Sequence, residues 1–417
     1  MVGGLFLGNV PAGSAGPAGV RIVGDQVAAA GPGVRAEPGD EVVDLTGYVL
    51  LPGLAEPHAH LEKAFTAGRT PTGTGDLADA IAAWIGLRGR LTEADFAGRA
   101  RRAALSYLAS GATAIRTHTD VGAEIGLIAF HALCDVRDEL AGTVDIEIVA
   151  AANCPVTGLA GRNNLAAARD AVAAGADVIG GAPWLDPDPA AAYRILLALA
   201  AEAGLPADFH VDETTDPAVD TLGQLLDLAE KGFPHRVTAS HVVSLGSRLL
   251  AEQQRAAERL AQAGAAVVTL PQTNLWLQDR DRDGSAAPAV RGLTPVRVLR
   301  AAGVPVAAGA DNLRDAFNPL GRADPLETAS LLAAAAHLPL DQALAAVTAD
   351  AWTTMGRPAP ALRAGSPAAF VAVAAADAND AVAGPPPDRV VIRGERVVAT
   401  TRTQREYPAP DRARVPG

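Results

Sequence analysis

Lysine, cysteine and aromatic residues are scarce in this sequence, and each scarcity excludes a class of structure or partner. The 417 residues include only two cysteines, Cys134 and Cys154, which can form neither a disulfide framework nor a four-thiolate metal site. We expect both thiols to be reduced and mostly buried. Aromatic residues make up 4% of the chain, and no basic patch is interleaved with them, so neither nucleic acid nor an anionic membrane is an expected partner.

Basic charge and long apolar runs are also lacking. The 35 Lys and Arg residues are outnumbered by 47 Asp and Glu, and the resulting net charge of -12 implies little beyond solubility. No uncharged apolar run reaches about 18 residues, which argues against a membrane span. The first residues lack a basic region followed by a long apolar core, which argues against a signal peptide. We therefore expect a cytoplasmic protein, and a homo-oligomer is compatible with the sequence.

The chain is long enough, and at 49% hydrophobic residues apolar enough, for one large α/β domain with a smaller attachment. Strand-like runs alternate with Ala-rich or amphipathic helical stretches, which is typical of a parallel sheet. Eight such strands predict a (β/α)8 TIM barrel, a fold of roughly 250 residues, within residues 51–359. The predicted barrel strands are 52–58, 113–118, 145–151, 177–181, 207–211, 236–241, 265–270 and 304–308.

Both ends of the chain have a different texture, with short β-like runs broken by Gly and Pro. We interpret residues 1–50 and 360–417 as one small β-sandwich domain built from both termini. Its predicted strands are 4–7, 19–23, 26–30, 41–45, 368–373, 389–393 and 395–399. Residues 339–356 are expected to form an extra helix leading back to the sandwich. The tail from about Thr403 is expected to be loosely ordered.

Two histidines, His58 and His60, end an apolar run at a spacing of two residues. On a β-strand this spacing puts both imidazoles on one face. Two neutral imidazoles held on a rigid strand form half of a divalent metal site. The alternative is two unrelated histidines at a strand end. The chain has only eight histidines, however, and three more end later apolar runs, which favours the metal site.

Other polar residues follow later predicted strands, at the C-terminal ends where (β/α)8 barrels carry their working residues. His210 follows the fifth strand, and Asp311 follows the eighth. Three imidazoles and one carboxylate suit Zn²⁺ or Fe²⁺ with an open position for water. Asp311 could alternatively cap a following helix, and the two roles can coexist. The predicted metal ligands are His58, His60, His210 and Asp311.

Glu213 and His241 supply the remaining predicted chemistry, so both are predicted catalytic residues. A metal lowers the pKa of its bound water toward ~7, and the resulting metal-bound hydroxide attacks an electron-poor carbon. Glu213 then delivers a proton to a ring nitrogen or leaving amine. His241 is expected to orient the hydroxide. The alternatives are a surface or capping carboxylate for Glu213 and a hydrogen-bonded core histidine for His241.

The two lysines of the chain bear on the number of metals. Lys63 follows the histidine pair, and Lys231 lies in a helix-end pattern. Neither is predicted on a middle barrel strand, where a modified lysine could bridge two ions. We therefore expect one divalent metal per chain, Zn or Fe.

These motifs together resemble the amidohydrolase superfamily, and within it the bacterial cytosine deaminase branch. The resemblance covers nearly the whole length. It implies a barrel with a terminal β-sandwich, a mononuclear Zn or Fe site with the ligands given above, and a proton-accepting role for Asp311 toward the attacking water. The motifs that carry it are Glu56-Pro57-His58-Ala59-His60-Leu61, Arg116-Thr117-His118-Thr119-Asp120, His210-Val211-Asp212-Glu213, Val237-Thr238-Ala239-Ser240-His241, Asn274-Leu275-Trp276-Leu277-Gln278-Asp279-Arg280 and Asn318-Pro319-Leu320-Gly321.

Departures from the cytosine deaminase pattern concern the substrate pocket. Asn153 stands near the position of a glutamine that reads the pyrimidine edge, or the loop there is shifted. Asn312 replaces a second acidic residue, Phe317 a stacking tryptophan, and Glu62 the usual aspartate after the histidine pair. Such changes alter specificity strongly. The predicted substrate-binding residues are Asn153, Asn312 and Phe317, with Trp184 and Trp276 as further candidates that could equally be packing residues.

The leading hypothesis is a metal-dependent hydrolase that deaminates a small cyclic amidine or aminated N-heterocycle, and the departures above disfavour cytosine itself. An alternative is an amidohydrolase that cleaves a cyclic amide or an N-alkyl C–N bond, because the same hydroxide and acid would serve. A remote alternative is a noncatalytic relative that binds a small ligand. In each case the expected partner is a small heterocyclic molecule.

Overall fold

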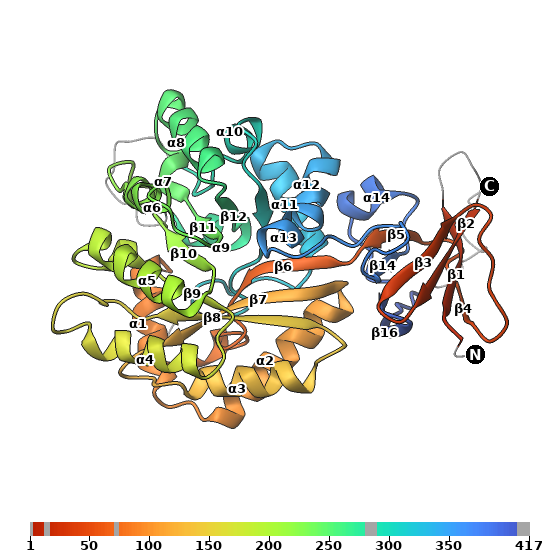
Figure 1. The fold of residues 1–417 in the computed structure, drawn as a ribbon, viewed down its shortest axis with the longest axis horizontal. Helices are drawn as coiled ribbons and strands as arrows, with labels where there is room; N and C mark the ends of the chain where they lie inside the picture. The colour runs from red at the N-terminus through yellow and green to blue at the C-terminus, as the bar shows by residue number, and fades with distance from the viewer. Residues whose placement is uncertain (1–2, 12–16, 71–74, 280–289, 407–417) are drawn as a thin grey trace, which may run out of the picture.

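A computed structural model describes residues 3–11, 17–70, 75–279 and 290–406 of the chain. It has a large barrel, ringed by helices, and a smaller pair of sheets beside it that is built from strands near both ends of the chain (Figure 1). Most of the tail for which loose order was predicted, residues 407–417, lies outside the described residues. In the part of the chain that is described, no helix is long and apolar enough to cross a membrane.

The barrel sheet has eight strands, each parallel to its sequence neighbour, in the order β6 to β13 around the sheet. This confirms the predicted (β/α)8 fold. Nearly all residues of these strands are buried because both of their faces are covered, one by the barrel interior and the other by helices. The strands are β6 (Leu54–Ala59), β7 (Ala112–Val121), β8 (Asp145–Ala152), β9 (Val178–Gly181), β10 (Ala207–Val211), β11 (Val237–His241), β12 (Ala266–Thr269) and β13 (Val306–Ala308).

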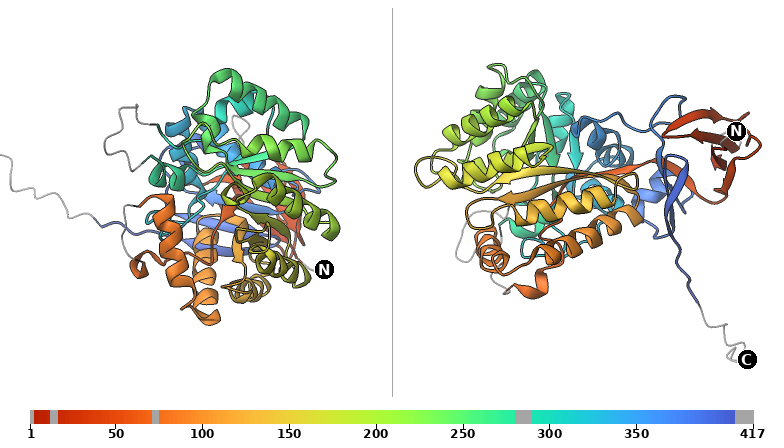
Figure 2. Two further views of the ribbon diagram at one scale, coloured as in Figure 1. Left: turned by 90° about the vertical axis from the view of Figure 1, so that its left-hand side faces the viewer. Right: turned by 60° about the horizontal axis from the view of Figure 1, so that its bottom comes forward.

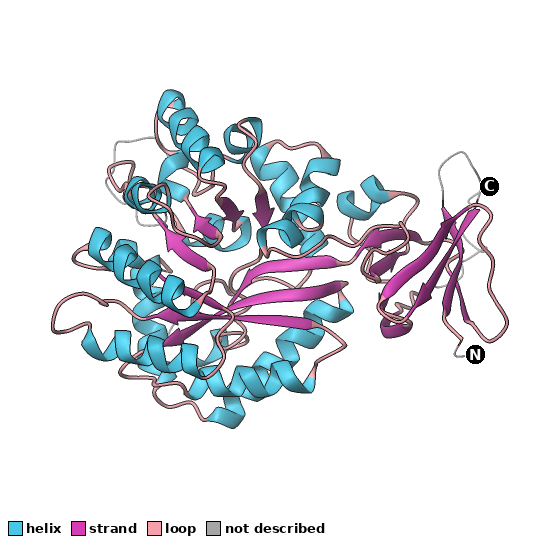
Figure 3. Cartoon of the chain, viewed as in Figure 1, coloured by secondary structure: helices cyan, strands magenta, loops and turns pink. Residues whose placement is uncertain are grey.

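The outer ring of the barrel is helical, as the secondary-structure view and the further views show (Figures 2 and 3). Side-chain caps mark several helix starts; the Thr92 hydroxyl, for example, accepts a hydrogen bond from the Asp95 N–H at the start of α2. The helices are α1 (Leu77–Arg88), α2 (Glu93–Ala109), α3 (Ile128–Glu139), α4 (Arg162–Ala173), α5 (Pro189–Ala203), α6 (Thr221–Ala229), α7 (Val243–Gly246), α8 (Leu250–Gln262), α9 (Pro271–Leu277), α10 (Val296–Ala301), α11 (Pro325–Ala336), α12 (Leu340–Ala346), α13 (Ala349–Thr354) and α14 (Ala378–Ala383), with short 3-10 turns η2 (Ala67–Arg69) and η3 (Pro183–Leu185).

The barrel closes between its first and last strands through the segment that follows β13. The Asp311 N–H donates to the His58 carbonyl at 3.0 Å, and the His60 N–H donates to the Asp311 carbonyl at 3.1 Å. The buried Glu56 carboxyl accepts hydrogen bonds from the N–H groups of His58 and Ala310, so it spans the seam between the first barrel strand and this segment. Gly309 is required here, because a Cβ at this position would lie 2.4 Å from Glu56 Oε1.

Two four-stranded sheets lie beside the barrel and share one apolar core. The first is β3-β2-β1-β4, formed by β1 (Leu5–Pro11), β2 (Pro17–Val23), β3 (Gln26–Gly31) and β4 (Glu41–Asp44). The second is β16-β15-β14-β5, formed by β5 (Val49–Pro52), β14 (Ala369–Val373), β15 (Arg389–Arg393) and β16 (Arg396–Thr401). Their shared core includes Leu5, Ile22, Leu50, Phe370 and Ile392, so side chains from both ends of the chain interdigitate.

Two predictions about these connections are wrong. The run predicted as one strand over 52–58 is divided at Gly53, because β5 pairs with β14 in the terminal sheet and only β6 enters the barrel. The extra helix predicted over 339–356 is two short helices, α12 and α13, separated at Val347 and Thr348. β6 runs from the terminal sheets into the barrel, so its C-terminal end points away from them (Figure 1).

Candidate metal centre

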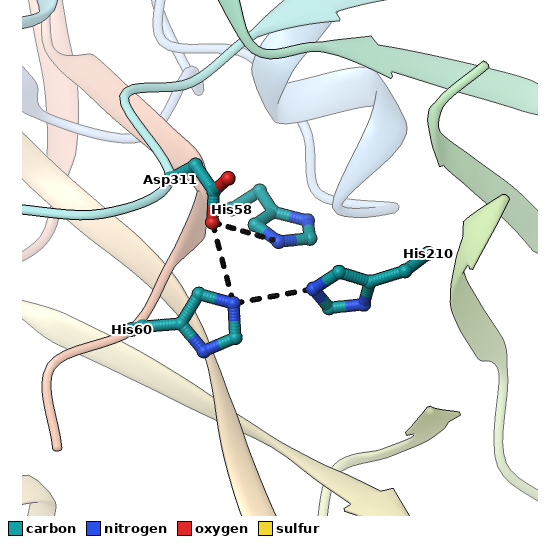
Figure 4. A group of neighbouring side chains, drawn as sticks. All are labelled: His58, His60, His210 and Asp311. Carbon is teal, nitrogen blue, oxygen red and sulfur yellow. Dashed lines mark hydrogen bonds and ion pairs between the residues drawn. The ribbon is translucent and has the colours of Figure 1, made fainter. Parts of the chain in front are cut away.

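Four polar side chains meet at the C-terminal ends of the barrel strands, and Figure 4 shows them converging on one point. His58 lies in β6, and His60 follows it directly. His210 lies in β10, and Asp311 follows β13. The structure therefore brings together all four residues that were predicted as ligands. No helix begins at Asp311, so the capping alternative has no counterpart in the described segment that follows it.

The candidate ligand atoms have the separations expected around one small ion. His60 Nε2 lies 3.2 Å from His210 Nε2 and 3.3 Å from Asp311 Oδ1. The same Asp311 oxygen lies 3.6 Å from His58 Nε2. Two ligands of a tetrahedral ion with bonds of about 2.0 Å are roughly 3.3 Å apart. The residues present thus fit a single divalent ion.

Electrostatics support the same conclusion. His58 Nε2 and Asp311 Oδ1 are buried and have no hydrogen-bond partner among the described residues, which is costly unless something else binds them. Burial and repulsion by the neighbouring histidines hold the pKa of His58 well below its ordinary value, so its imidazole is neutral and keeps a lone pair. Burial and the neighbouring Glu213 carboxyl raise the pKa of Asp311. A divalent cation would supply the missing positive charge.

Glu213 and His241 lie beside this cluster. His241 Nδ1 is 3.5 Å from Glu213 Oε1, and His241 Nε2 is 3.9 Å from Asp311 Oδ2. Asn274, in α9, donates to His241 Nδ1 at 3.0 Å. The proton of a neutral His241 is therefore on Nε2, the atom that faces Asp311. Burial raises the pKa of Glu213 to about 8, so its carboxyl tends to keep a proton.

Left-handed backbone conformations place both of these side chains. His210 and Glu213 are three residues apart, a spacing that would put them on opposite faces of a regular strand. Asp212, directly after β10, has a left-handed φ of 49°, which turns the chain before Glu213. Its carboxylate accepts hydrogen bonds from the N–H and hydroxyl of Thr221. His241 itself has a φ of 72°. Strain of this kind is frequent at functional sites.

A cavity of about 400 Å³ opens beside the cluster. Its wall includes the predicted residues Asn153, Asn312 and Phe317 together with Glu213. The Asn312 amide donates to Asp315 Oδ2 at 2.8 Å, so it is anchored by a buried carboxyl behind it.

The wall does not include the two tryptophans predicted as candidates, Trp184 and Trp276. In η3 it is Leu185 that lines the cavity, and a neighbour in a 3-10 helix points a third of a turn away. In α9 Asn274 faces the site, and a residue two positions later points about 200° around the helix.

A second cluster of polar side chains on the cavity wall, centred on Asp120, was not predicted from the sequence. Asp120, at the end of β7, accepts from Lys63 Nζ at 3.1 Å, from Trp84 Nε1 at 2.8 Å and from Arg88 Nη1 at 3.2 Å. Trp84 and Arg88 belong to α1, which also contributes Leu77 and other apolar side chains to the wall. The sequence does hold one signal for Asp120. It lies two residues beyond His118 in the motif 116–120, so on a strand the two side chains share one face.

The fold and this cluster define a class of barrel enzymes in which histidines and an aspartate at the strand ends can hold a divalent ion. Within it, residues 77–402 match the model described as the Amidohydrolase family, and the chain belongs to that family.

Three relatives show the breadth of chemistry among similar proteins. The chain is 32% identical over 360 residues to a pterin deaminase of Rhizobium rhizogenes, covering 85% of this chain and 82% of that one. It is similar to the crystal structure of N-isopropylammelide isopropylaminohydrolase from Burkholderia multivorans, with 32% identity, a TM-score of 0.83 and coverage of 96% and 99%. It is also similar to 5-methylcytosine deaminase from Klebsiella pneumoniae liganded with 5-fluorocytosine, with 26% identity, a TM-score of 0.86 and coverage of 97% and 99%.

Proposed function

We propose that this protein is a metal-dependent hydrolase that removes an amino group, as ammonia, from a small aminated N-heterocycle. The observation that carries the proposal is the convergence of four ligand-type atoms next to the buried acid Glu213, on the wall of a cavity. Names of similar proteins, a pterin deaminase and a 5-methylcytosine deaminase, favour the same reaction on a ring amine.

One divalent ion, Zn²⁺ or Fe²⁺, would be held by His58, His60, His210 and Asp311. When bound, it would supply a Lewis acid that lowers the pKa of water toward neutrality. We propose one ion per chain because β9, the fourth barrel strand, has no lysine. Lys63 follows the first barrel strand, and its Nζ lies 2.9 Å from His60 Nδ1 and 3.1 Å from Asp120 Oδ1.

The protein residues would move the protons of the reaction. Water adds its oxygen to the carbon that bears the amine, the C–N bond breaks, and ammonia leaves. Asp311 accepts a proton from the attacking water. Glu213, whose raised pKa lets it hold a proton near neutral pH, protonates the ring nitrogen or the departing amine. His241 Nε2–H, fixed by Asn274, orients the attacking oxygen.

Asn153, Asn312 and Phe317 would contact the heterocycle from the cavity wall. An amide at Asn312 provides hydrogen-bond donors and an acceptor but no charge. A substrate that requires a carboxylate partner at this position is therefore disfavoured, and this is the reason why cytosine is disfavoured.

The test is ammonia release from a panel of pyrimidines, triazines, purines and pterins by protein loaded with Zn²⁺ or Fe²⁺. We expect release from at least one member and none from the metal-free protein. Absence of ammonia with every member and both metals would contradict the proposal.

A second candidate function is hydrolysis of an N-alkyl C–N bond, favoured by the 32% identity to an isopropylaminohydrolase over 96% of this chain. The same residues could perform it, because only the leaving amine differs. Adding an N-isopropylamino triazine to the panel separates the two functions, since this reaction releases isopropylamine and no ammonia.

A further inference from the structure

A row of buried polar side chains lies beneath the candidate metal cluster, and the proposed mechanism does not use it. Asp208 precedes His210 by two residues on β10, and Arg116 precedes His118 by two residues on β7. A spacing of two puts each pair on one strand face. Asp208 and His118 are completely buried, and Arg116 is 1% exposed. Polar groups at this depth need partners in order to be tolerated.

Ser240, in β11, links this row to His58. The Ser240 hydroxyl donates to Asp208 Oδ1 at 2.8 Å, and Ser240 Oγ lies 2.9 Å from His58 Nδ1. A hydroxyl has one proton to donate. Because that proton goes to Asp208, Ser240 must accept the hydrogen bond from His58 Nδ1–H. The lone pair of His58 is then on Nε2, the atom nearest Asp311.

Arg116 and His118 complete the arrangement around Asp208. Arg116 Nη1 donates to Asp208 Oδ2 at 2.9 Å, and Arg116 Nε donates to Glu147 Oε2 at 2.9 Å. The guanidinium compensates a carboxylate that would otherwise be buried without a counter-charge. The His118 ring stacks on the His58 ring, with centroids 3.8 Å apart and planes 22° apart, and so restricts rotation of His58.

We propose that Asp208, acting through Ser240, is a positioning residue that fixes the tautomer and ring orientation of His58, and that Arg116 holds Asp208 in place as a hydrogen-bond acceptor. This inference rests on the proposed metal site. Partners that orient a ligand histidine in this way typically affect metal affinity by about 10- to 100-fold when they are removed.

The test measures Zn²⁺ affinity by competition with a chelator in the full-length protein. We expect Ser240→Ala and Asp208→Asn to weaken Zn²⁺ binding by about 10- to 100-fold. Both variants should also shift the visible absorption bands of the Co²⁺-substituted protein, because these bands report the geometry of the ligands. Ser240→Ala is the milder change and serves if Asp208→Asn does not fold.

Two matched controls separate positioning from general stability. Ser244→Ala removes a buried hydroxyl that donates to the Val219 carbonyl at 2.8 Å. Asp324→Asn disrupts a buried carboxylate paired with Arg389 at 2.7 Å. Both should keep the native Zn²⁺ affinity and Co²⁺ spectrum, even where the protein becomes less stable.

The result that overturns this inference is native Zn²⁺ affinity and a native Co²⁺ spectrum in Ser240→Ala, while His210→Ala abolishes binding. In that case the metal site of the proposed function stands and only the positioning role fails. A wild-type protein that binds neither Zn²⁺ nor Fe²⁺, or a His210→Ala variant that binds the ion normally, overturns both proposals.

Discussion

Glu213 is the residue on which the proposed proton transfers depend, and its environment makes it testable. Its carboxyl is 3.5 Å from both His241 Nδ1 and Asn274 Nδ2, and it is not one of the four proposed ligands. We expect Glu213→Gln to lower turnover by about 10²- to 10⁴-fold, because general acid–base catalysis contributes that much.

Metal content measured on the same Glu213→Gln protein should equal that of the wild type. Glu202→Gln, at an exposed position of α5, is the control and should retain full activity. Undiminished turnover in Glu213→Gln would remove Glu213 from the mechanism.

Asn312 is another single residue whose chemistry can be isolated. Its amide donates to the buried Asp315, and burial raises the pKa of Asp315 to about 6. Asn312→Asp would replace this donor with a second carboxyl. When the pKa of a carboxyl is higher in the folded state than in the unfolded state, the free energy of unfolding falls as the pH rises from the unfolded-state pKa through the folded-state pKa.

We therefore expect Asn312→Asp to reduce the free energy of unfolding by about 1–3 kcal/mol at pH 8, and by less at pH 5. Urea denaturation at both pH values measures the difference. Asn9→Asp is the matched control, because Asn9 donates to Asp44 at 2.9 Å in an exposed pair where water screens the charges. Equal losses for Asn312→Asp at both pH values would contradict the argument.

At the level of elements, helix α1 forms part of the cavity wall and is attached to the barrel through Asp120. Lys63 and Arg88 lower the pKa of Asp120 to about 2 despite its burial, so it remains a carboxylate that accepts three donors. Asp120→Asn should release Trp84 and Arg88. Loss of a hydrogen bond to a charged group is worth about 1.5–3 kcal/mol, which corresponds to a rise of about tenfold or more in KM.

Steady-state kinetics on the active panel member should show a larger change in KM than in kcat, because the Asp120 carboxylate accepts hydrogen bonds from Lys63, Trp84 and Arg88 and from none of the four proposed ligands. Glu124→Gln is the control. The Glu124 side chain is 72% exposed, and its substitution removes only the ion pair on the outer side of Arg88. A fall in kcat with unchanged KM for Asp120→Asn would show that the α1 wall does not govern binding.

Secondary structure was predictable where an apolar run has clear ends. The predicted strands 207–211 and 389–393 coincide with β10 and β15. The division at Gly53 was not predictable, because β5 and β6 form one continuous apolar run and only pairing with the distant β14 separates them.

The candidate site shows the same distinction. Histidines at a spacing of two are visible in the sequence, and the structure brings their predicted partners together. The contribution of Trp84 depends on a hydrogen bond to Asp120 across 36 residues, for which no local pattern exists. The side-chain directions of Glu213 and His241 depend on left-handed φ angles at Asp212 and His241, which non-glycine residues rarely adopt.

At the scale of the whole molecule, the proposed ion would connect distant parts of the barrel. His58 lies in the first barrel strand and His60 directly follows it, while His210 lies in the fifth strand and Asp311 in the segment after the eighth. A ligand that binds only the folded state at 100 times its dissociation constant adds about 2.7 kcal/mol of stability. We expect chelator treatment to lower the thermal unfolding midpoint, and added Zn²⁺ to restore it in a concentration-dependent way.

Hydrogen exchange on the metal-free protein should become faster at the seam amides of His60 and Asp311, which bond the first strand to the last segment. His210→Ala is the control, since Zn²⁺ should not restore its midpoint. An unfolding midpoint that does not respond to metal in the wild-type protein would contradict a closing role for the ion.

The placement of Asp311 at the far end of the barrel has a consequence for biosynthesis. A ribosome that has translated 310 residues has produced three of the four proposed ligands, and the seam cannot yet form because its second edge has not been made. Capture of the ion by all four residues would then have to wait until Asp311 is made, 251 residues after His60. In the proposed arrangement, a chain made without the ion would have only the backbone hydrogen bonds of the seam and the Glu56 carboxyl to join its first barrel strand to the segment after the eighth.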